Sequence, residues 1–330
     1  MRTIDWVDGE IRLIDQTRLP DELVVVHVTD VDALIDAIRS LAVRGAPALG
    51  VAGALGVALL AARQPGDAAM VITQAGRLRA ARPTAVNLAR GVDRALARLD
   101  EGPAAVLAEA LRVRDEEIAA SAAMAALGAD LVAGLVPRPR VRAMTICNTG
   151  ALAAVEGGTA LAVVAELHAR GVLEQAIALE TRPLLQGARL TTWELARLGA
   201  PYRLIVDSAA ASVLARGLAD VVLTGADRVT RNGDTANKIG SLGLALAARH
   251  AGVPFVVVAP ESTIDLDTAT GADIEIEERP EVEVTAFRGV STAAAGTRAL
   301  NPAFDVTPAD LVTAIVTDRR VVRLDRGERL

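Results

Sequence analysis

The 330-residue sequence contains a single cysteine, so no disulfide can form within the chain. This fits a reducing compartment, and the charged opening, MRTIDWVDGEIRLID, lacks the apolar core of a secretory signal. The net charge is −6 and no cluster of lysine and arginine occurs, which argues against a nucleic-acid-binding protein. The sequence therefore predicts a cytoplasmic protein that binds neither nucleic acid nor a membrane.

Lysine is nearly absent, because Lys238 is the only one among 35 lysine and arginine residues. A chain that uses arginine wherever any cation will serve keeps a lysine where a compact ammonium group is needed. A chance lysine on the surface is the alternative. Asparagine is also scarce, and four of its positions lie in or beside segments discussed below: Asn87, Asn148, Asn232 and Asn237.

One long uncharged run, residues 46–62, approaches the length of a membrane span. It consists mostly of alanine and glycine, has a proline at its second position, and is flanked by Arg44 and Arg63. Small residues suit a helix that neighbouring protein surrounds closely on all sides. We therefore expect a buried core helix in a soluble protein.

The first part of the chain is expected to form a small antiparallel sheet followed by helices. Short apolar runs broken by Asp-Gly and Leu-Pro predict the sheet over residues 3–30, and Thr29-Asp30 is typical of a helix start. From there to about residue 135 the pattern is helical and rich in alanine. Breaks in this pattern fall near 44–45, 64–66, 82–83 and 102–103.

Beyond the segment PRPR at 137–140, short apolar runs alternate with stretches of helix length. This alternation is typical of βαβ units and predicts an α/β fold with a doubly wound, mostly parallel sheet. We place the domain boundary there, between domains at 1–136 and 137–330. The tail is expected to contain a helix capped near Thr307-Pro308 and a last strand. The predicted strands are 143–146, 176–180, 202–207, 221–225 and 255–260.

Ligands of a parallel sheet collect at the carboxyl ends of its strands, so the residues that follow each strand are candidates. Cys147 follows the run at 143–146 and is expected to precede a helix, whose positive end stabilises a thiolate. Asp227 follows the run at 221–225, and a carboxylate facing the core would be costly. The alternatives are a small buried core cysteine and an aspartate that caps a helix or pairs with an arginine.

Asn232-Gly233 predicts a tight turn, and Asp234 or Thr235 is expected to cap a helix that follows. Asn237 and Lys238 would then lie in the first helical turn, where a cation opposes the helix dipole unless an anion is bound. A bound phosphate would resolve this conflict, which makes Lys238 a candidate phosphate ligand.

Three further segments are suited to binding an anion. The run 180–189 carries two arginines and Gln186 on a loop that enters a helix, a set that fits a polyhydroxy phosphate ester, although a solvated loop is the alternative. Arg44-Gly45-Ala46 and Arg82 lie at expected helix starts. The motifs GxSxG, HExxH and the P-loop do not occur and the three histidines are scattered, so we expect no metal and no cofactor.

Several of these segments resemble the methylthioribose-1-phosphate isomerase family. The resemblance runs in the same order along the whole chain, from Trp6 and DQTRLP (15–20) to the tail. The family is similar in fold to the regulatory subunits of eukaryotic initiation factor 2B. The matching segments are RGAPALG (44–50), RPTAVN (82–87), CNTGALA (147–153), ETRPLLQGARLTTWEL (180–195), GADRVTRNGDTANKIG (225–240) and NPAFDVTP (301–308).

The resemblance implies an aldose–ketose isomerase of methionine salvage that converts 5-methylthioribose 1-phosphate into 5-methylthioribulose 1-phosphate. It implies a Rossmann-like C-terminal domain, a homodimer and no metal or nucleotide cofactor. It also implies that Cys147 and Asp227 are catalytic, with the aspartate as proton donor. The substrate-binding residues that it implies are Arg44, Gly45, Ala46, Arg82, Gln186, Asn237 and Lys238.

The chemistry suits these residues, because phosphate on the anomeric oxygen blocks spontaneous ring opening. The enzyme must protonate the ring oxygen, and Asp227 can do so if a dry pocket raises its pKa. Cys147 can act as a base or stabilise a transient cation, so proton and hydride shifts both stay open. Aromatic residues make up 2% of the chain, so any wall around a methylthio group must be mostly aliphatic.

Two other functions stay open. One is an isomerase of a related 1-phosphorylated pentose, such as 5-deoxyribose 1-phosphate or ribose 1,5-bisphosphate. The other is a non-catalytic regulatory subunit of the initiation-factor-2B type, in which we would not expect the pair Cys147 and Asp227.

Overall fold

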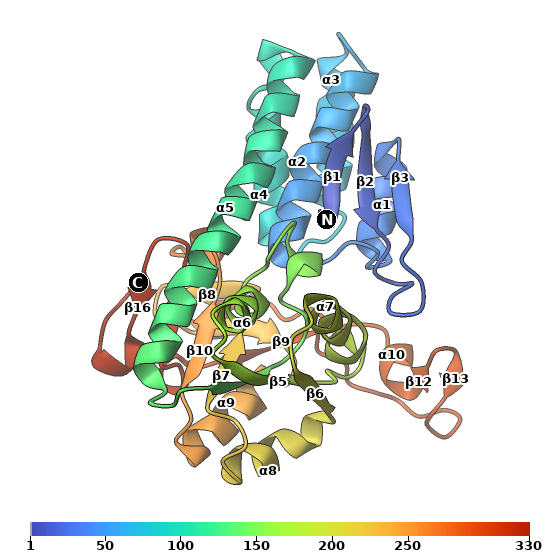
Figure 1. Cartoon of the computed structure of the whole chain (residues 1–330). Coiled ribbons are helices and arrows are strands. Elements are labelled where there is room, and N and C mark those ends of the chain that lie inside the picture. Colours follow the sequence, from blue (N-terminus) through green and yellow to red (C-terminus); the bar gives the residue numbers. More distant parts are fainter. Residues whose placement is uncertain (1) are drawn as a thin grey trace.

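A computed structural model describes residues 2–330, and Figure 1 shows it coloured along the chain. The chain opens with an antiparallel three-stranded sheet in the order β1-β2-β3, as predicted. Asp8 and Gly9, between the first two strands, have φ of 51° and 84°, and positive φ at both positions is typical of a tight hairpin turn. The strands are β1 (Ile4–Val7), β2 (Glu10–Ile14) and β3 (Val25–Val28).

Five helices follow, which confirms the predicted helical region. Asp30 caps the first of them, because its carboxylate accepts a hydrogen bond from the Ala33 N–H at 2.9 Å. Proline stands in the first turn of the second and fifth helices, where a missing N–H costs nothing. The helices are α1 (Val31–Arg39), α2 (Ala46–Arg63), α3 (Ala68–Arg79), α4 (Val86–Leu96) and α5 (Pro103–Leu135).

Helix α2 is the uncharged run, and it is the central helix of this part of the molecule. All its residues from Pro47 to Ala61 are buried. By length and composition α2 and α5 could each span a membrane, but 83% of the apolar window of α2 is buried inside the protein. The predicted core helix is therefore confirmed.

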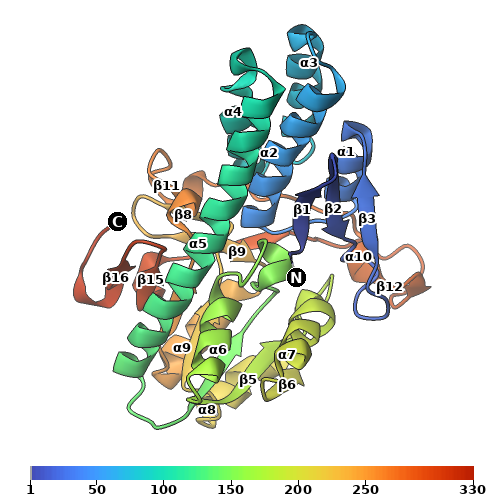
Figure 2. The ribbon, with the colours of Figure 1, turned by 45° about the horizontal axis from the view of Figure 1, so that its top comes forward.

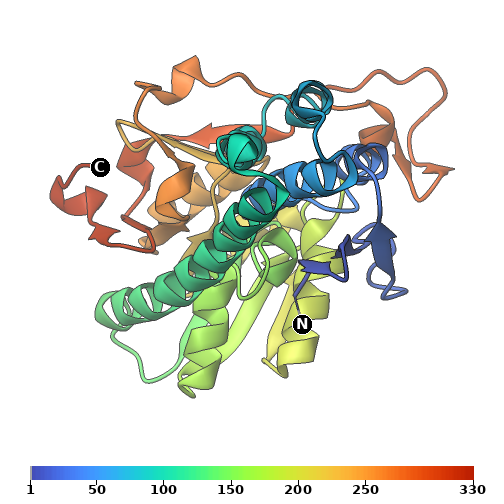
Figure 3. The ribbon, with the colours of Figure 1, turned by 90° about the horizontal axis from the view of Figure 1, so that it is seen from above.

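Helix α5 connects the two parts of the molecule (Figures 1 and 3). Its first half, including Val106 and Val113, packs in the same core as α2 and α4. Its second half, including Val132, packs against α6 (Ala160–Ala169) over the large sheet. Because α5 ends at Leu135 and the first strand of the large sheet begins at Val141, we propose that the domain boundary lies between these two residues.

A seven-stranded sheet of order β16-β15-β10-β7-β4-β5-β6 forms the C-terminal part. All neighbouring strands run parallel except β16, which pairs antiparallel with β15. The predicted α/β class is confirmed, and each of the five predicted strands is present. The strands are β4 (Val141–Thr145), β5 (Leu173–Leu179), β6 (Tyr202–Ile205), β7 (Val221–Thr224), β10 (Phe255–Val258), β15 (Ala314–Val316) and β16 (Val321–Val322).

Helices cover both faces of this sheet (Figure 2). Val221 packs with α5 and α6 on one face, whereas the next residue, Val222, packs with α8 (Ala210–Ala215) and α9 (Ser241–Ala251) on the other. This follows from the two-residue period of a strand, which sends successive side chains to opposite faces. A strand that is covered on both faces explains why all four residues of VVLT are buried and why its first three are apolar.

The helix predicted to follow a cap at Asp234 or Thr235 is wrong in its first part. Thr235–Lys238 form strand β9, and α9 begins only at Ser241. Strand β9 belongs to a smaller sheet of order β11-β8-β9-β14, in which it pairs antiparallel with β14 (Phe304–Thr307). A partner so distant in the sequence overrides the local helix signal. The remaining strands of this sheet are β8 (Arg228–Thr230) and β11 (Ile264–Asp265).

Two other expected helices are also replaced by different structure. No helix directly follows Gly150, because a single 3-10 turn at Ala151–Ala153 and a loop precede α6. After Thr307-Pro308 the chain forms only a 3-10 turn, Ala309–Leu311, and then continues into β15 and the predicted last strand. Between β11 and β14, a long and mostly irregular segment carries α10 (Val282–Thr285) and the hairpin β12 (Ala286–Phe287) and β13 (Val290–Ser291).

Candidate active site

The structure brings Cys147 and Asp227 to the same edge of the large sheet. Strands β4 and β7 are parallel neighbours, and each of the two residues follows the end of one of them. Both line one small cavity of about 50 Å³. The thiol and the carboxylate predicted as an acid–base pair are therefore placed together at the end of the sheet where α/β folds bind ligands.

The backbone of Cys147 is held by two threonines from the segment that follows β5. The Thr181 hydroxyl accepts a hydrogen bond from the Cys147 N–H at 2.8 Å, and the Thr191 hydroxyl donates to the Cys147 carbonyl at 2.6 Å. Cys147 has φ of 64°, a left-handed conformation that costs energy for a residue with a Cβ atom. The two threonines fix this conformation and with it the direction of the thiol.

Asp227 lies at the start of the β8–β9 hairpin, and its N–H donates to the Ala236 carbonyl at 2.9 Å. Burial raises the pKa of the Asp227 carboxyl above its ordinary value. Lys238, Arg82 and Arg44 lie close enough to oppose this effect, but the pKa of Asp227 remains raised. The carboxyl can therefore hold a proton at a higher pH than an exposed aspartate.

Arg44 is buried, and three hydrogen bonds fix its guanidinium. The Nε donates to Gln16 Oε1 at 3.1 Å and the Nη1 to the Asn148 carbonyl at 3.0 Å, while Nη2 donates to Asn148 Oδ1. Burial lowers the pKa of Arg44, and the nearby groups of Cys147, Glu194 and Asp227 oppose that change. The guanidinium is thus a fixed cation beside the cavity.

The start of α2 forms another wall of the cavity, which Gly45 and Ala46 line. Gly45 has φ of 98°, and a Cβ atom there would lie 2.4 Å from the Ala153 carbonyl oxygen. Only glycine therefore permits this close approach. The helix start supplies backbone N–H groups without partners inside the helix, which are suited to an anion.

Asn237 and Lys238 reach the site from strand β9 rather than from a helix. Asn237 lines the cavity, and its Nδ2 donates to Ser241 Oγ at 2.9 Å. The Lys238 Nζ donates to the Ala303 carbonyl at 2.8 Å and lies 5.2 Å from the centre of the Phe304 ring. Burial lowers the pKa of Lys238, and the groups of Cys147 and Asp227 oppose that change. The position of Lys238 is therefore consistent with the prediction, although the helix-dipole argument for it was wrong.

Arg82 and Gln186 lie beside the cavity rather than in its lining. Arg82 forms an ion pair with Glu277 at 3.2 Å and still lowers the pKa of Asp227. Gln186 lines a neighbouring pocket of about 380 Å³, of which Arg44 is also a wall. The buried Oε1 of Gln186 has no hydrogen-bond partner within residues 2–330. An unpaired acceptor beside the site is suited to a ligand hydroxyl.

Two glutamates near the site were not predicted. Glu194, in α7 (Thr192–Leu198), is buried behind Cys147 and Arg44, and Glu277 accepts a hydrogen bond from the Thr84 hydroxyl at 2.9 Å as well as from Arg82. Burial raises the pKa of Glu277, but Arg82, Thr84 and Arg279 outweigh it and the net pKa is lowered. Glu194 lies within the matching segment 180–195, whereas the irregular segment around Glu277 carries no periodic signal.

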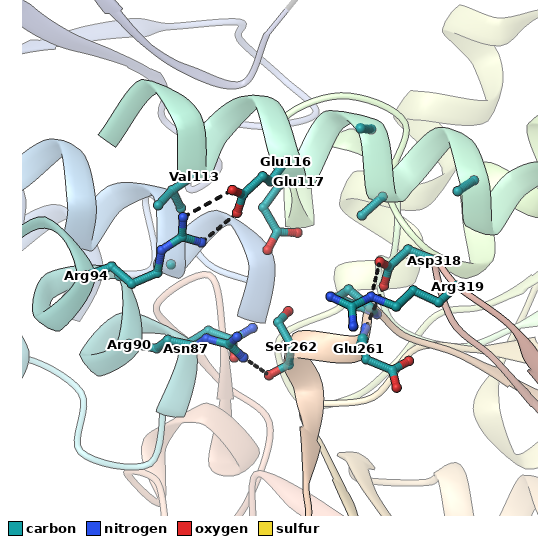
Figure 4. Close-up of a pocket in the computed structure, with 16 residues that line it drawn as sticks. Asn87, Arg90, Arg94, Val113, Glu116, Glu117, Glu261, Ser262, Asp318 and Arg319 are labelled. Carbon is teal, nitrogen blue, oxygen red and sulfur yellow. Dashed lines mark hydrogen bonds and ion pairs between the residues drawn. The ribbon is translucent and has the colours of Figure 1, made fainter. Parts of the chain in front are cut away.

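A larger pocket of about 490 Å³ lies between α4, α5 and two C-terminal loops (Figure 4). It shares only Pro260 with the cavity of Cys147 and Asp227. Arg94 forms an ion pair with Glu116 at 2.6 Å there, and burial raises the pKa of Glu117 to about 7. This pocket does not contain the predicted chemistry.

Comparison with known proteins agrees with this geometry. A family model described as "Initiation factor 2 subunit family" matches residues 42–323. A probable bifunctional methylthioribose-1-phosphate isomerase/methylthioribulose-1-phosphate dehydratase from Nocardia farcinica is 55% identical over 98% of the chain, which spans 60% of that relative. A methylthioribose-1-phosphate isomerase from Thioalkalivibrio sulfidiphilus is 47% identical over 99% of the chain and 95% of its own length. A 5-deoxyribose 1-phosphate isomerase from Moorella thermoacetica is 48% identical over 97% and 93%.

Two solved structures are similar over nearly the whole chain. The 5-methylthioribose 1-phosphate isomerase from Pyrococcus horikoshii superposes with a TM-score of 0.88 at 39% identity, covering 98% of this chain and 92% of that one. A protein from A. fulgidus, described as the delta subunit of translation initiation factor eIF-2B, superposes with a TM-score of 0.86 at 40% identity, covering 98% and 96%.

Proposed function

This chain belongs to the initiation factor 2 subunit family, and we propose that within it the chain is an aldose–ketose isomerase of methionine salvage. It converts 5-methylthioribose 1-phosphate into 5-methylthioribulose 1-phosphate. It is a soluble metabolic enzyme, and we place it in the cytoplasm. The dehydratase activity named for the Nocardia relative is not assigned to this chain, which spans only 60% of that protein.

The observation that carries the proposal is a thiol and a carboxylate at the ends of two adjacent strands, facing one cavity. Asp227, whose pKa is raised by burial, would donate a proton to the ring oxygen and so open the ring. Cys147 would then serve the transfer of hydrogen between C2 and C1, as the base of a proton shift or as the group that stabilises a cation in a hydride shift.

The surrounding cations support a phosphorylated substrate. Arg44 and the backbone N–H groups of Gly45 and Ala46 would hold the phosphate at the start of α2. Arg82, Asn237 and Lys238 would complete the binding of the phosphate and the sugar oxygens. Because Lys238 and Arg44 both interact with Cys147 and Asp227, a bound dianion would also compensate the positive charge around the pair.

The pocket beside the cavity supports an apolar group at C5. Gln186, with its unpaired Oε1, would bind a sugar hydroxyl where the two pockets meet at Arg44. Aliphatic and aromatic side chains form much of the wall farther out. These side chains are Leu41, Leu184, Leu190, Val282 and Phe287. These side chains suit a methylthio group, whereas Arg189 and Arg288 of the same pocket would suit a second phosphate, so a comparison of substrates separates the two.

The second candidate substrate is 5-deoxyribose 1-phosphate, which the name of the Moorella relative suggests. The kcat/KM of the wild type for the methylthio sugar, the deoxy sugar and ribose 1,5-bisphosphate separates the candidates. We expect the methylthio sugar to be preferred. A preference for either of the other sugars would make that sugar the substrate instead. If none of the three is turned over, the chain is better explained as a regulatory subunit.

The catalytic pair is tested by Cys147→Ser and Asp227→Asn. We expect each substitution to lower kcat by about 100- to 10,000-fold, the usual contribution of a positioned acid or base. Substrate binding, measured by calorimetry, should survive, because the residues that hold the phosphate are unchanged. Coupled assays of turnover give the comparison.

The matched control for the aspartate is Asp267→Asn, which changes an exposed carboxyl outside the cavity. It should leave turnover unchanged. Wild-type turnover in either Cys147→Ser or Asp227→Asn would rule out that residue as a catalytic group.

We propose further that the enzyme is a homodimer that binds a small sugar phosphate. Strand β6 lies at the edge of the large sheet, and its neighbourhood exposes Tyr202, Leu204 and Val206. An apolar edge strand with unpaired N–H and C=O groups is a ready surface for association with another chain. This supports a second copy at β6.

A further inference from the structure

A buried carboxylate that the proposed chemistry does not use lies directly behind the active site. Glu194 is only 8% exposed, and its two oxygens accept three hydrogen bonds. The Ala151 N–H donates to Oε2 at 2.7 Å, while the Leu152 N–H at 3.3 Å and the Asn148 Nδ2 at 2.8 Å donate to Oε1. All three donors follow Cys147 within five residues of the chain, so Glu194 holds the loop that carries the thiol.

These contacts close into a ring of hydrogen bonds around Arg44. Asn148 links Glu194 to the guanidinium, because its Nδ2 donates to Glu194 while its Oδ1 accepts from Arg44 Nη2. On the other side, Arg44 Nε donates to Gln16, and the Gln16 Nε2 donates to the Leu152 carbonyl at 2.7 Å. The Leu152 N–H then returns to Glu194. Every side chain in the ring is buried.

We propose that Glu194 is a positioning residue, which acts through Asn148 to aim the Arg44 guanidinium at the phosphate of the substrate. The inference rests on the proposed function for the identity of that phosphate. A guanidinium carries five N–H bonds, of which two in Arg44 belong to the ring and a third donates to the Asn148 carbonyl. The plane of the group is thereby fixed, and two N–H bonds remain for a ligand.

The negative charge of Glu194 matters as well as its shape. Arg44 would otherwise be a buried cation whose fixed partners are all neutral, and Glu194 is the carboxylate nearest to it in the ring. Burial raises the pKa of Glu194 on balance, while the hydrogen bonds that Asn148, Leu152 and Ala151 donate to its oxygens favour the charged form and oppose that change. A neutral amide in its place could still accept from Asn148 and Leu152 through its one oxygen, but its NH2 group would face the Ala151 N–H, and the negative charge would be lost.

Close packing is a second way in which Glu194 influences the position of the phosphate site. A Cβ atom at Gly150 would lie 2.2 Å from Glu194 Oε2, so the carboxylate fits directly against the backbone of the turn at Ala151–Ala153. The same turn contacts Gly45, where a Cβ atom would lie 2.4 Å from the Ala153 carbonyl oxygen. Glu194 therefore holds the turn against which the start of α2 rests.

The test is a double-mutant cycle with Glu194→Gln and Arg44→Lys. The affinity for inorganic phosphate, from calorimetry, and the KM and kcat for the sugar are measured for the four proteins. We expect Glu194→Gln to weaken phosphate binding and raise KM by about 10- to 100-fold, which is the range found when a residue that orients a metal ligand is replaced. Arg44→Lys should then cost little more in the Glu194→Gln background, because two residues that act through one contact are not additive.

A reciprocal exchange provides the rescue. In Glu194→Gln with Asn148→Asp, the carboxylate stands next to Arg44 and the new amide donates to it, while the amide oxygen accepts from the Ala151 N–H. The exchanged protein should regain phosphate affinity to within about tenfold of the wild type, since a negative charge again lies beside Arg44 and only the Leu152 N–H, whose contact is the longest of the three, lacks its acceptor. Glu109→Gln is the control, because Glu109 is an equally buried glutamate paired with Arg94 outside both pockets that border Arg44. It should lower stability without changing phosphate affinity.

Two results would overturn the inference. One is an additive cycle, in which Arg44→Lys costs as much in the Glu194→Gln background as in the wild type, since Glu194 would then support only the fold. The other is a phosphate affinity that does not differ between Glu194→Gln and the wild type, which includes the case in which neither binds phosphate. Absence of turnover with every sugar would instead reject the proposed function, and the phosphate cycle would still decide the role of Glu194.

Discussion

Asp227 is the residue whose ionisation the fold changes most directly in favour of the proposed chemistry. Its carboxyl lies among Lys238, Arg82 and Arg44, which favour the charged form, yet burial outweighs them and the pKa is raised. A carboxyl with a raised pKa costs stability once it ionises, because folding then buries a charge. The folded enzyme therefore keeps the Asp227 carboxyl protonated at a pH at which the same carboxyl in the unfolded chain has lost its proton.

This gives a pH dependence with a definite sign. Below the pKa of an unfolded aspartate, about 4, Asp227 is protonated in both states and costs nothing. As pH rises from that value to the higher folded pKa, the wild type loses stability that Asp227→Asn keeps, because the unfolded aspartate ionises first. We expect the free energy of unfolding of Asp227→Asn, minus that of the wild type, to grow as pH rises above about 4 and to level off above the folded pKa, measured by urea denaturation. A difference independent of pH would contradict the raised pKa.

The rarity of lysine in the sequence pointed to Lys238 as a site residue but did not show which element carries it. Its uniqueness among 34 arginines predicted a place where a compact cation is needed, and the side chain is buried beside Phe304 with only the Ala303 carbonyl as acceptor within hydrogen-bond distance among the described residues. The planar fork of an arginine would need several acceptors there. The strand that carries Lys238 could not be predicted, because it depends on pairing with the distant strand β14, where Phe304 lies opposite Lys238.

At the scale of the elements, α2 determines how closely the N-terminal helices approach one another. A Cβ atom at Gly91 of α4 would lie 2.0 Å from the Gly50 carbonyl oxygen of α2, and one at Gly53 would lie 2.7 Å from the Leu88 carbonyl oxygen. Both contacts are with backbone, which cannot move aside without separating the helices. The scarcity of large side chains in residues 46–62 is therefore a requirement of packing, and it also brings the start of α2 to the cavity.

Gly91→Ala tests this close approach. We expect the substitution to cost about 1–3 kcal/mol of unfolding free energy, the usual cost of overpacking, because α4 must move away from α2. Gly76→Ala is the matched control, since Gly76 lies on the exposed face of α3 and a Cβ atom there meets nothing within 4 Å. It should stabilise the protein by about 0.5–1 kcal/mol. Equal effects of the two substitutions in chemical denaturation would contradict the packing argument.

At the scale of the whole molecule, the site exists because two parts of the chain meet. The large sheet supplies Cys147 and Asp227, the N-terminal helices supply Arg44 and Arg82, and the irregular segment before β14 returns to place Glu277 against Arg82. Helix α5 spans both parts and packs in both cores, so it fixes the distance between them. A change in how these parts sit would alter the phosphate site before it altered the catalytic pair.

The same scale decides the oligomeric state. If two copies associate through β6, the mass in solution should be twice the 34.2 kDa of one chain, measured by light scattering after gel filtration. Leu204→Arg, at an edge position that is 47% exposed, should then give the monomer. Leu246→Arg, on the exposed face of α9, changes a side chain of similar exposure and should leave the mass unchanged. A dimer that survives Leu204→Arg would place the interface elsewhere.

The sequence by itself determined the fold class, five strands of the large sheet with a last strand in the tail, and the side chains that follow these strands, because periodicity of apolar residues and strand-end position are local signals. It also predicted five site residues from their residue types, which are suited to binding anions or transferring protons. These residues are Arg44, Gly45, Cys147, Asp227 and Lys238. Only the tertiary structure decided that Asn237 and Lys238 lie on a strand, and that Glu194 and Glu277 support the site. Their partners lie far away along the chain, and contacts at such separations are set by packing rather than by any local pattern.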